Sequence, residues 1–232
     1  MQNILSHYMR ERMANRGFEG QKKEPGPVIT VSRAYGCPGK LTGQELVAAL
    51  NKKLMLSRDK RHWRMISKEI LEESAKELKL DKVTIKEAAH SHESNIMTSL
   101  IQSLSGKFYP GDDKVKRTIA DIILTFANEG KVVIVGRAAV VLTQDIKKSI
   151  HIKLDAPMDW RVKNVCKLYG MNPDEATKKI LEIDYKRDKL RDYYAGKKPI
   201  DWIYNITFNM DKMTVEEIVA TTVNIMEMRE ML

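Results

Sequence analysis

The stretch VITVSRAYGCPGKLTG, residues 28–43, decides the fold of this chain. Its first four residues are β-branched and follow a Pro-Gly-Pro breaker, so they predict a short buried strand. The glycines and the proline that come next predict a tight turn. Residues 44–54 then predict a helix, because apolar side chains recur on one of its faces. Those side chains are Leu46, Val47, Leu50 and Leu54.

The turn has the composition of a phosphate-binding loop. Glycines let the backbone curl so that successive N–H groups point at phosphate oxygens, and the helix that follows adds its positive end. Compared with the pattern Gly-x-x-x-x-Gly-Lys-Ser/Thr, Ala34 replaces the first glycine and the hydroxyl comes one residue late, at Thr42. A turn that only connects a strand to a helix has a similar composition, and that alternative stays open. The nucleotide contacts predicted here are Gly36, Cys37, Gly39, Lys40, Leu41 and Thr42, with Thr42 also expected to hold a metal ion.

The rest of the chain continues the alternation of strands and helices. Further strands are predicted at residues 132–135, 150–154 and 204–208. Residues 64–127 are expected to be mainly helical, with Ile66 in one of the helices. Asn172 and Thr214 have the sequence context of helix N-caps. Strands separated by helices predict a parallel α/β sheet with right-handed crossovers.

Composition limits the classes of protein. The chain has 232 residues, 43% of them hydrophobic, and a net charge of +9. Residues 1–26 are expected to form an amphipathic helix and a linker that pack on protein rather than on a membrane, and residues 27–232 a single domain. No apolar run approaches the roughly 20 residues that span a bilayer, so we expect a soluble, cytoplasmic protein without membrane partners.

Three pieces of sequence resemble the cytidylate kinase-like family, in order and spacing. They are SRAYG at residues 32–36, VIVGRA at 133–138, and DYKR at 184–187 with YYAG at 193–196. The resemblance implies a three-layer P-loop NTPase fold with a central parallel sheet, a helical insert for the nucleoside monophosphate at about 60–115 and a helical lid at about 170–198. It implies ATP and Mg²⁺ as cofactors, and phosphoryl transfer to a nucleoside monophosphate, CMP or dCMP first. The oligomeric state is not fixed by the sequence, and a homodimer is one alternative.

The resemblance also assigns roles to four arginines. Arg137 would bind the acceptor phosphate, and Arg187 and Arg191, on one helical face, would act as catalytic residues beside Lys40 by neutralising the transferred group. Arg161 would stack on the adenine of ATP. From spacing alone, Arg137 as a plain surface residue and a salt-bridge ladder of the α-helical arginines with Asp184 and Asp188 remain alternatives.

Residues 37–40 depart from the family pattern, because members typically carry Ser-Gly-Gly-Arg where this chain has Cys-Pro-Gly-Lys. Pro38 removes one N–H group, and no counterpart of the acceptor-site arginine stands near Ser67. A nucleotide sensor that has lost turnover is therefore one rival function. A nucleic-acid binder, motivated by charge alone, is a second, and we do not expect it. Cys37 is expected to be a small filler, with a low-pKa thiol at the helix start as its alternative.

Overall fold

The computed structural model describes residues 25–54, 61–67, 113–196, 200 and 202–232. The chain forms two compact units, and the unit made of Pro25–Ile66 and Ile122–Leu232 contains the sheet. Most of the other unit, and with it the predicted N-terminal helix and most of the predicted insert, lies outside the described residues.

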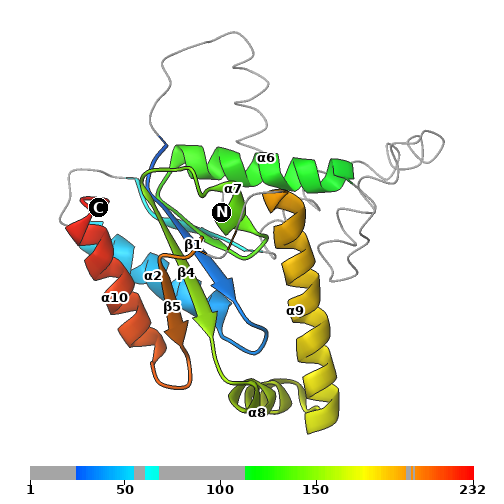
Figure 1. Ribbon diagram of the computed structural model, residues 1–232. Coiled ribbons are helices and arrows are strands. Elements are labelled where there is room, and N and C mark those ends of the chain that lie inside the picture. The colour runs from blue at the N-terminus through cyan, green and yellow to red at the C-terminus, as the bar shows by residue number, and fades with distance from the viewer. Residues whose placement is uncertain (1–24, 55–60, 68–112, 197–199, 201) are drawn as a thin grey trace, which may run out of the picture. The chain divides into compact units, whose positions relative to one another are not determined.

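In the described part of the chain, five parallel strands form one sheet in the order β2-β3-β1-β4-β5 (Figure 1). The central strands are buried along most of their length, which explains the continuous β-branched runs of β1 and β3 and the alternating apolar residues of β4. The predicted parallel sheet is therefore confirmed. The strands are β1 Val28–Arg33, β2 Arg64–Ile66, β3 Val132–Val135, β4 Ser149–Asp155 and β5 Ile206–Asn209.

Helices cover both faces of the sheet and give the three layers (Figure 1). On one face α2 packs against α10, and Leu46, Leu50, Ile218 and Met226 share one buried cluster with the sheet. On the other face α9 packs against α7 and α8. The helices are α2 Gly39–Leu54, α6 Asp113–Glu129, α7 Ala139–Leu142, α8 Met158–Tyr169, α9 Pro173–Ala195 and α10 Val215–Met228.

The connections place a crevice at the carboxyl ends of β1 and β4. The chain leaves β1 through α2 and returns at the β2 edge of the sheet, whereas it leaves β4 through α8 and α9 and returns at the opposite edge, β5. Because the two departing connections diverge, ligands of open α/β sheets bind between them. The glycine-rich loop, residues 34–38, lies at this point.

Both predicted N-caps are confirmed, and two predicted elements need correction. Asn172 Oδ1 accepts from Glu175 N at 2.9 Å, and Thr214 Oγ1 accepts from Glu217 N at 3.2 Å. Ile66, predicted in a helix, ends strand β2, because three residues carry no period of their own and pairing with β3 decides their state. The last strand begins at Ile206, not at residue 204.

His151 on β4 is buried in surroundings that favour its neutral form. It is 4% exposed, its Nδ1 lies 2.8 Å from Thr30 Oγ1, and its Nε2 lies 3.0 Å from Ser149 Oγ. Burial lowers the pKa of His151 from 6.5 to about 4. The ring therefore stays uncharged in the folded protein at pH values where an exposed histidine is protonated.

We expect the free energy of unfolding to fall as the pH is lowered from 6.5 to 4. In this window the unfolded chain binds a proton at this position and the folded chain does not. The neutral ring therefore contributes roughly 3 kcal/mol of stability that is fully present above pH 6.5 and is lost as the pH falls to 4. Urea unfolding across this range measures the loss. His151→Gln should flatten the pH dependence, and His62→Gln, at an exposed position, should leave it unchanged. Equal pH dependence in all three proteins would contradict the assignment.

Candidate active site

The glycine-rich loop is held between β4 and α8. Ala34 N donates to Leu154 O at 2.9 Å, and the side chain of Asn164 donates to Gly36 O. Gly36 has φ +97°, and a Cβ at this position would lie 3.2 Å from both Cβ and O of Arg161. Glycine is needed here for its backbone conformation and for the close approach of α8.

Besides the amide of Ala34, three further amides of the loop and of the first residue of α2 donate to groups of the protein itself. Tyr35 N donates to Asp184 Oδ1 at 2.8 Å, Cys37 N to Ala34 O at 3.2 Å, and Gly39 N to Cys37 O at 2.9 Å. The expectation that successive loop amides point inward together is therefore not met in this conformation. The carboxylate of Asp184 takes the position of an anion on the first of them.

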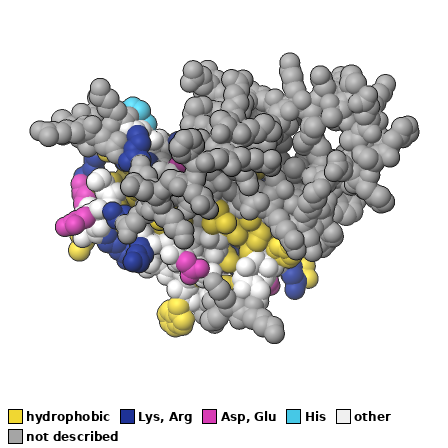
Figure 2. Space-filling view, turned by 90° about the horizontal axis from the view of Figure 1, so that it is seen from above, with side chains coloured by type: hydrophobic (Ala, Val, Ile, Leu, Met, Phe, Trp, Pro, Cys, Tyr) yellow, Lys and Arg dark blue, Asp and Glu magenta, His cyan; other side chains and the backbone are white. Residues whose placement is uncertain are grey.

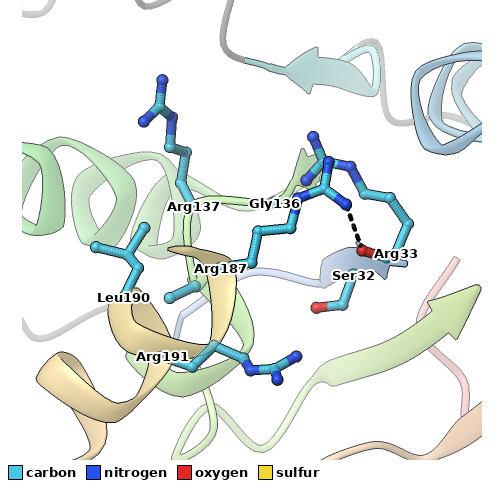
Figure 3. Close-up of a pocket in the computed structure, with 8 residues that line it drawn as sticks. Ser32, Arg33, Gly136, Arg137, Arg187, Leu190 and Arg191 are labelled. Carbon is cyan, nitrogen blue, oxygen red and sulfur yellow. Dashed lines mark hydrogen bonds between the residues drawn. The ribbon is translucent and has the colours of Figure 1, made fainter. Parts of the chain in front are cut away.

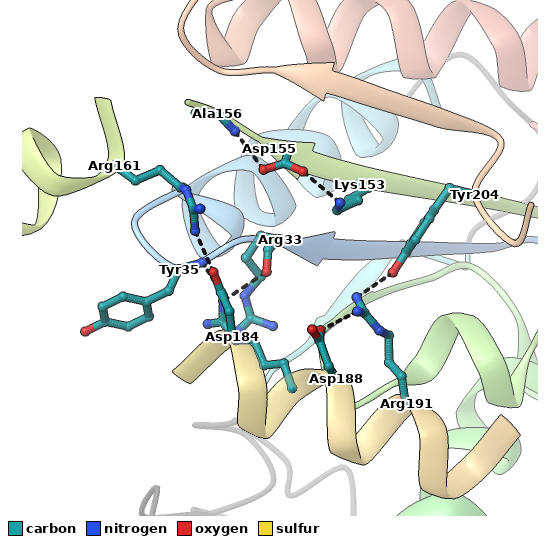
Figure 4. Close-up of polar contacts among 11 residues, drawn as sticks. Arg33, Tyr35, Lys153, Asp155, Ala156, Arg161, Asp184, Asp188, Arg191 and Tyr204 are labelled. Atoms are coloured by element: carbon teal, nitrogen blue, oxygen red, sulfur yellow. Dashed lines mark hydrogen bonds and ion pairs between the residues drawn. The ribbon is translucent and has the colours of Figure 1, made fainter. Parts of the chain in front are cut away.

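Asp184 joins the loop to both neighbouring helices (Figure 4). Its Oδ2 accepts from Arg161 Nη1 at 2.5 Å, and its Oδ1 accepts from Arg187 Nη1 at 3.4 Å. The side chains of Arg161 and Asp184 are 12% and 27% exposed, so water screens this pair only in part. The predicted stacking of Arg161 on adenine stays a prediction.

Arg187 and Arg191 project from α9 toward the ends of the strands. Arg187 Nη1 also donates to Arg33 O at 2.9 Å, and its guanidinium lies 5.5 Å from the centre of the Tyr35 ring. Burial lowers the pKa of Arg187, with Asp184 opposing the effect. Arg191 donates to Tyr204 Oη at 3.1 Å and pairs with Asp188. The salt-bridge alternative is thus present beside the shared face.

Four arginines line a small cavity of about 40 Å³ (Figure 3). Arg33 and Arg137 come from the ends of β1 and β3, and Arg187 and Arg191 from α9. The described residues that line it include no carboxylate. In Figure 3 the side chain of Arg187 points toward Arg33, whereas the guanidinium of Arg137 points away from it.

The backbone beside this cavity is strained. Gly136, Arg137 and Ala138 have φ values of +78°, +57° and +53°, so three consecutive residues are left-handed. For residues other than glycine this conformation costs on the order of 1 kcal/mol or more and persists where the surrounding structure enforces it. It turns the chain sharply at the carboxyl end of β3 and places Arg137 at the rim of the cavity.

A sequence model of the cytidylate kinase-like family matches residues 28–212, which include the loop, all four arginines and α9. The chain belongs to this family. As a cytidylate kinase-like protein with a P-loop fold, it is a nucleotide-dependent phosphotransferase, of a class that uses ATP with a divalent metal. No curated protein sequence matches it.

Several solved structures are similar to this cytidylate kinase-like protein. An uncharacterized protein from Eubacterium ventriosum is 22% identical with a TM-score of 0.59, covering 87% of this chain and 98% of its own. Shikimate kinase from Bacteroides thetaiotaomicron is 15% identical with a TM-score of 0.44, covering 87% and 98%. A gluconokinase from Sinorhizobium meliloti is 13% identical with a TM-score of 0.45, covering 85% and 90%.

The start of α2 in this cytidylate kinase-like protein presents Lys40 and Leu41 rather than a hydroxyl. Both side chains are exposed, while Thr42 is fully buried and its Oγ1 donates to Pro38 O at 3.0 Å. Asp155 Oδ1 accepts a hydrogen bond from Ala156 N at 2.9 Å, and Asp155 Oδ2 forms an ion pair with Lys153 Nζ at 2.7 Å. Among the described residues no three His, Cys, Asp or Glu side chains cluster as metal ligands. The metal role of Thr42 stays a prediction.

Cys37 is a core residue of this loop. It is 9% exposed within the cluster that includes β1 and α2. Burial, and next the charge of Asp155, raise the pKa of the Cys37 thiol from 9.0 to about 12. The filler interpretation is confirmed, and the low-pKa alternative is wrong, because desolvation and the charge of Asp155 outweigh the lowering effect of Arg161 and Arg187 on the thiol pKa.

We expect Cys37 to resist alkylation in the folded protein. A thiol pKa of about 12 lowers the reactive thiolate fraction about 10³-fold relative to an ordinary cysteine, and burial adds to the protection. Iodoacetamide labelling followed by peptide mass spectrometry should modify Cys166, which is partly exposed, well before Cys37. Both should react in urea. Equal labelling rates in the folded protein would contradict the burial of Cys37.

Arg33 and the role of Asp184 were not predicted from the sequence. Arg33 ends a strand that was predicted to be buried, directly before the loop, and that position was the available signal. Asp184 was considered only as a partner within its own helix. Its contacts with Tyr35 and Arg161 join segments 149 and 23 residues apart, which helical spacing does not reveal.

Proposed function

We propose that this protein transfers the γ-phosphoryl group of ATP to a nucleoside monophosphate, with CMP or dCMP as the first acceptors to test. The observation that carries the proposal is the cavity lined by four arginines beside the glycine-rich loop. A transferring phosphoryl group and its neighbours carry several negative charges, and catalysis consists mainly of positioning and neutralising them. Membership of the cytidylate kinase-like family supports the nucleotide as substrate.

The proposed roles follow from where the side chains lie. Lys40, exposed at the start of α2, and the loop would hold the phosphates of ATP in its magnesium complex. Arg137 would bind the acceptor, and Arg187 and Arg191 would neutralise the moving group from α9. The acceptor oxygen attacks the γ-phosphorus directly and ADP leaves, so no covalent enzyme intermediate forms.

Binding of ATP requires a rearrangement of the loop. Because the amides of Tyr35, Cys37 and Gly39 are bonded within the protein, phosphate oxygens must replace Asp184 and loop carbonyls as their acceptors. Movement of α9 with Arg187 and Arg191 over the bound nucleotides would then exclude water and suppress hydrolysis of ATP. We therefore interpret α9 as the lid.

The test is acceptor-dependent formation of ADP from ATP. CMP, dCMP, UMP and AMP are compared in the wild type, Lys40→Ala and Lys52→Ala, which removes an exposed lysine from the same helix. We expect Lys40→Ala to lower kcat/KM by about 10² or more, because it removes a charged phosphate ligand, and Lys52→Ala to leave it unchanged. No turnover above the Lys40→Ala level with any acceptor would contradict the proposal.

A nucleotide sensor is the second candidate, favoured by Pro38 and by the engaged amides of the loop. Tight binding of ATP without transfer to any acceptor would support it. The nucleic-acid binder has less support, because only the net charge of +9 motivates it. Among the described residues visible in Figure 2, Lys and Arg side chains lie beside Asp and Glu side chains. Among the described residues, every helix is too short or too polar to cross a bilayer.

A further inference from the structure

Arg33 lies between the glycine-rich loop and the end of β3. It is the last residue of β1, directly before the loop. A Cβ added at Gly39, in the first turn of α2, would lie 3.0 Å from Arg33 Cδ, and a Cβ added at Gly136 would lie 1.9 Å from Arg33 Nη1. The side chain thus runs from the phosphate loop to the end of β3 across two positions without side chains.

Arg33 is also tied to the lid. Its carbonyl oxygen accepts from Arg187 Nη1 at 2.9 Å, so one residue supplies a backbone contact to α9 and a guanidinium to the cavity (Figure 3). Arg187 points toward Arg33, whereas Arg137 points away from it. Of the two arginines at the strand ends, Arg33 is the one that faces the lid in this conformation.

The cavity suits a small, highly charged anion. Its volume of about 40 Å³ corresponds to about three water-sized positions, which a phosphate group can fill. Arginine presents a planar fork of donors that matches two phosphate oxygens at once, and such charge-assisted pairs are about twice as strong as neutral ones.

We propose that Arg33 is a phosphate-binding residue of this enzyme, which grips the phosphate of the acceptor opposite Arg187. This inference rests on the proposed function for the identity of the acceptor, but the binding of a phosphate group by Arg33 does not. Gly39 and Gly136 are, on this view, the space through which the guanidinium reaches the phosphate.

The test measures binding rather than turnover. Inorganic phosphate, CMP and cytidine are titrated by calorimetry into the wild type, Arg33→Met and Arg229→Met, which removes an exposed arginine near the start of β4. We expect Arg33→Met to weaken phosphate and CMP at least tenfold and to leave cytidine unchanged. Arg229→Met should change each affinity less than twofold.

Two outcomes overturn the proposal: wild-type protein that does not bind phosphate, or a folded Arg33 variant that binds it as tightly as the wild type. Arg33→Gln replaces Arg33→Met if circular dichroism shows the latter unfolded. If Arg33→Met weakens phosphate binding but the wild type shows no turnover of CMP, the result supports phosphate binding by Arg33 and contradicts only the proposed acceptor.

Discussion

Arg187→Ala is expected to lower kcat for phosphoryl transfer about 10³-fold while ATP affinity changes by less than about threefold. An arginine that meets charge developing in the transition state is worth 10³ to 10⁵ in kcat in related chemistry. In the proposed site Arg187 would lie within reach of this charge, because it contacts Arg33 O and the Tyr35 ring beside the loop. The measurement is steady-state kcat with saturating ATP and acceptor, together with ATP affinity by calorimetry.

Two further variants separate charge from geometry at this position. Arg187→Lys keeps the positive charge but not the fork of donors, so we expect only partial recovery of kcat. Lys189→Ala removes an exposed charge from the same helix, over the Tyr185 ring, and should leave kcat unchanged. If kcat of Arg187→Ala equals that of the wild type, α9 does not supply transition-state charge and the lid interpretation is wrong.

Asp184→Ala is expected to lower the free energy of unfolding by about 2 kcal/mol, and sulfate should restore part of the loss. The substitution leaves Arg161, Arg187 and the Tyr35 amide without their shared carboxylate, and breaking a fully buried pair costs more still. A sulfate ion offers the same donors an equivalent acceptor. Melting temperatures with and without sulfate measure both effects.

Asp188→Ala is the matched control for this prediction. Asp188 pairs with Arg191 one turn further along α9, but its side chain is 55% exposed. An exposed pair contributes roughly 0 to 1 kcal/mol, so Asp188→Ala should lower the melting temperature only slightly, with no larger response to sulfate than the wild type. Equal stability of Asp184→Ala and the wild type would show that the Asp184 contacts do not hold the loop.

Sequence reasoning succeeded where the local pattern and the tertiary environment agree. The buried strands at 28 and 132 were predicted from β-branched runs, which occur where helices cover both faces of a sheet, and the strand at 150 from alternating apolar residues. The caps at Asn172 and Thr214 are local by nature, since each hydrogen bond spans three residues. Strand β2 was missed because its state depends on pairing with β3, far along the chain.

The site could be predicted only in part, for the same reason. Residue types at strand ends identified Arg137, and helical spacing identified the face shared by Arg187 and Arg191, which the cavity brings together. Neither reveals that Asp184 binds the Tyr35 amide or that Arg33 crosses two glycines. These contacts arise from packing of α8, α9 and the loop, and burial likewise reverses the reactivity considered for Cys37.

The internal hydrogen bonds of the glycine-rich loop have a consequence for nucleotide affinity. When only a fraction of the molecules is competent to bind, the apparent dissociation constant equals the intrinsic one divided by that fraction. If about one molecule in a hundred turns the amides of Cys37 and Gly39 outward, ATP binds about a hundredfold more weakly than to a permanently open loop. The stability of the loop with its internal hydrogen bonds then sets the ATP concentration at which the enzyme is half saturated. Residues that stabilise this loop affect that concentration without contacting the nucleotide.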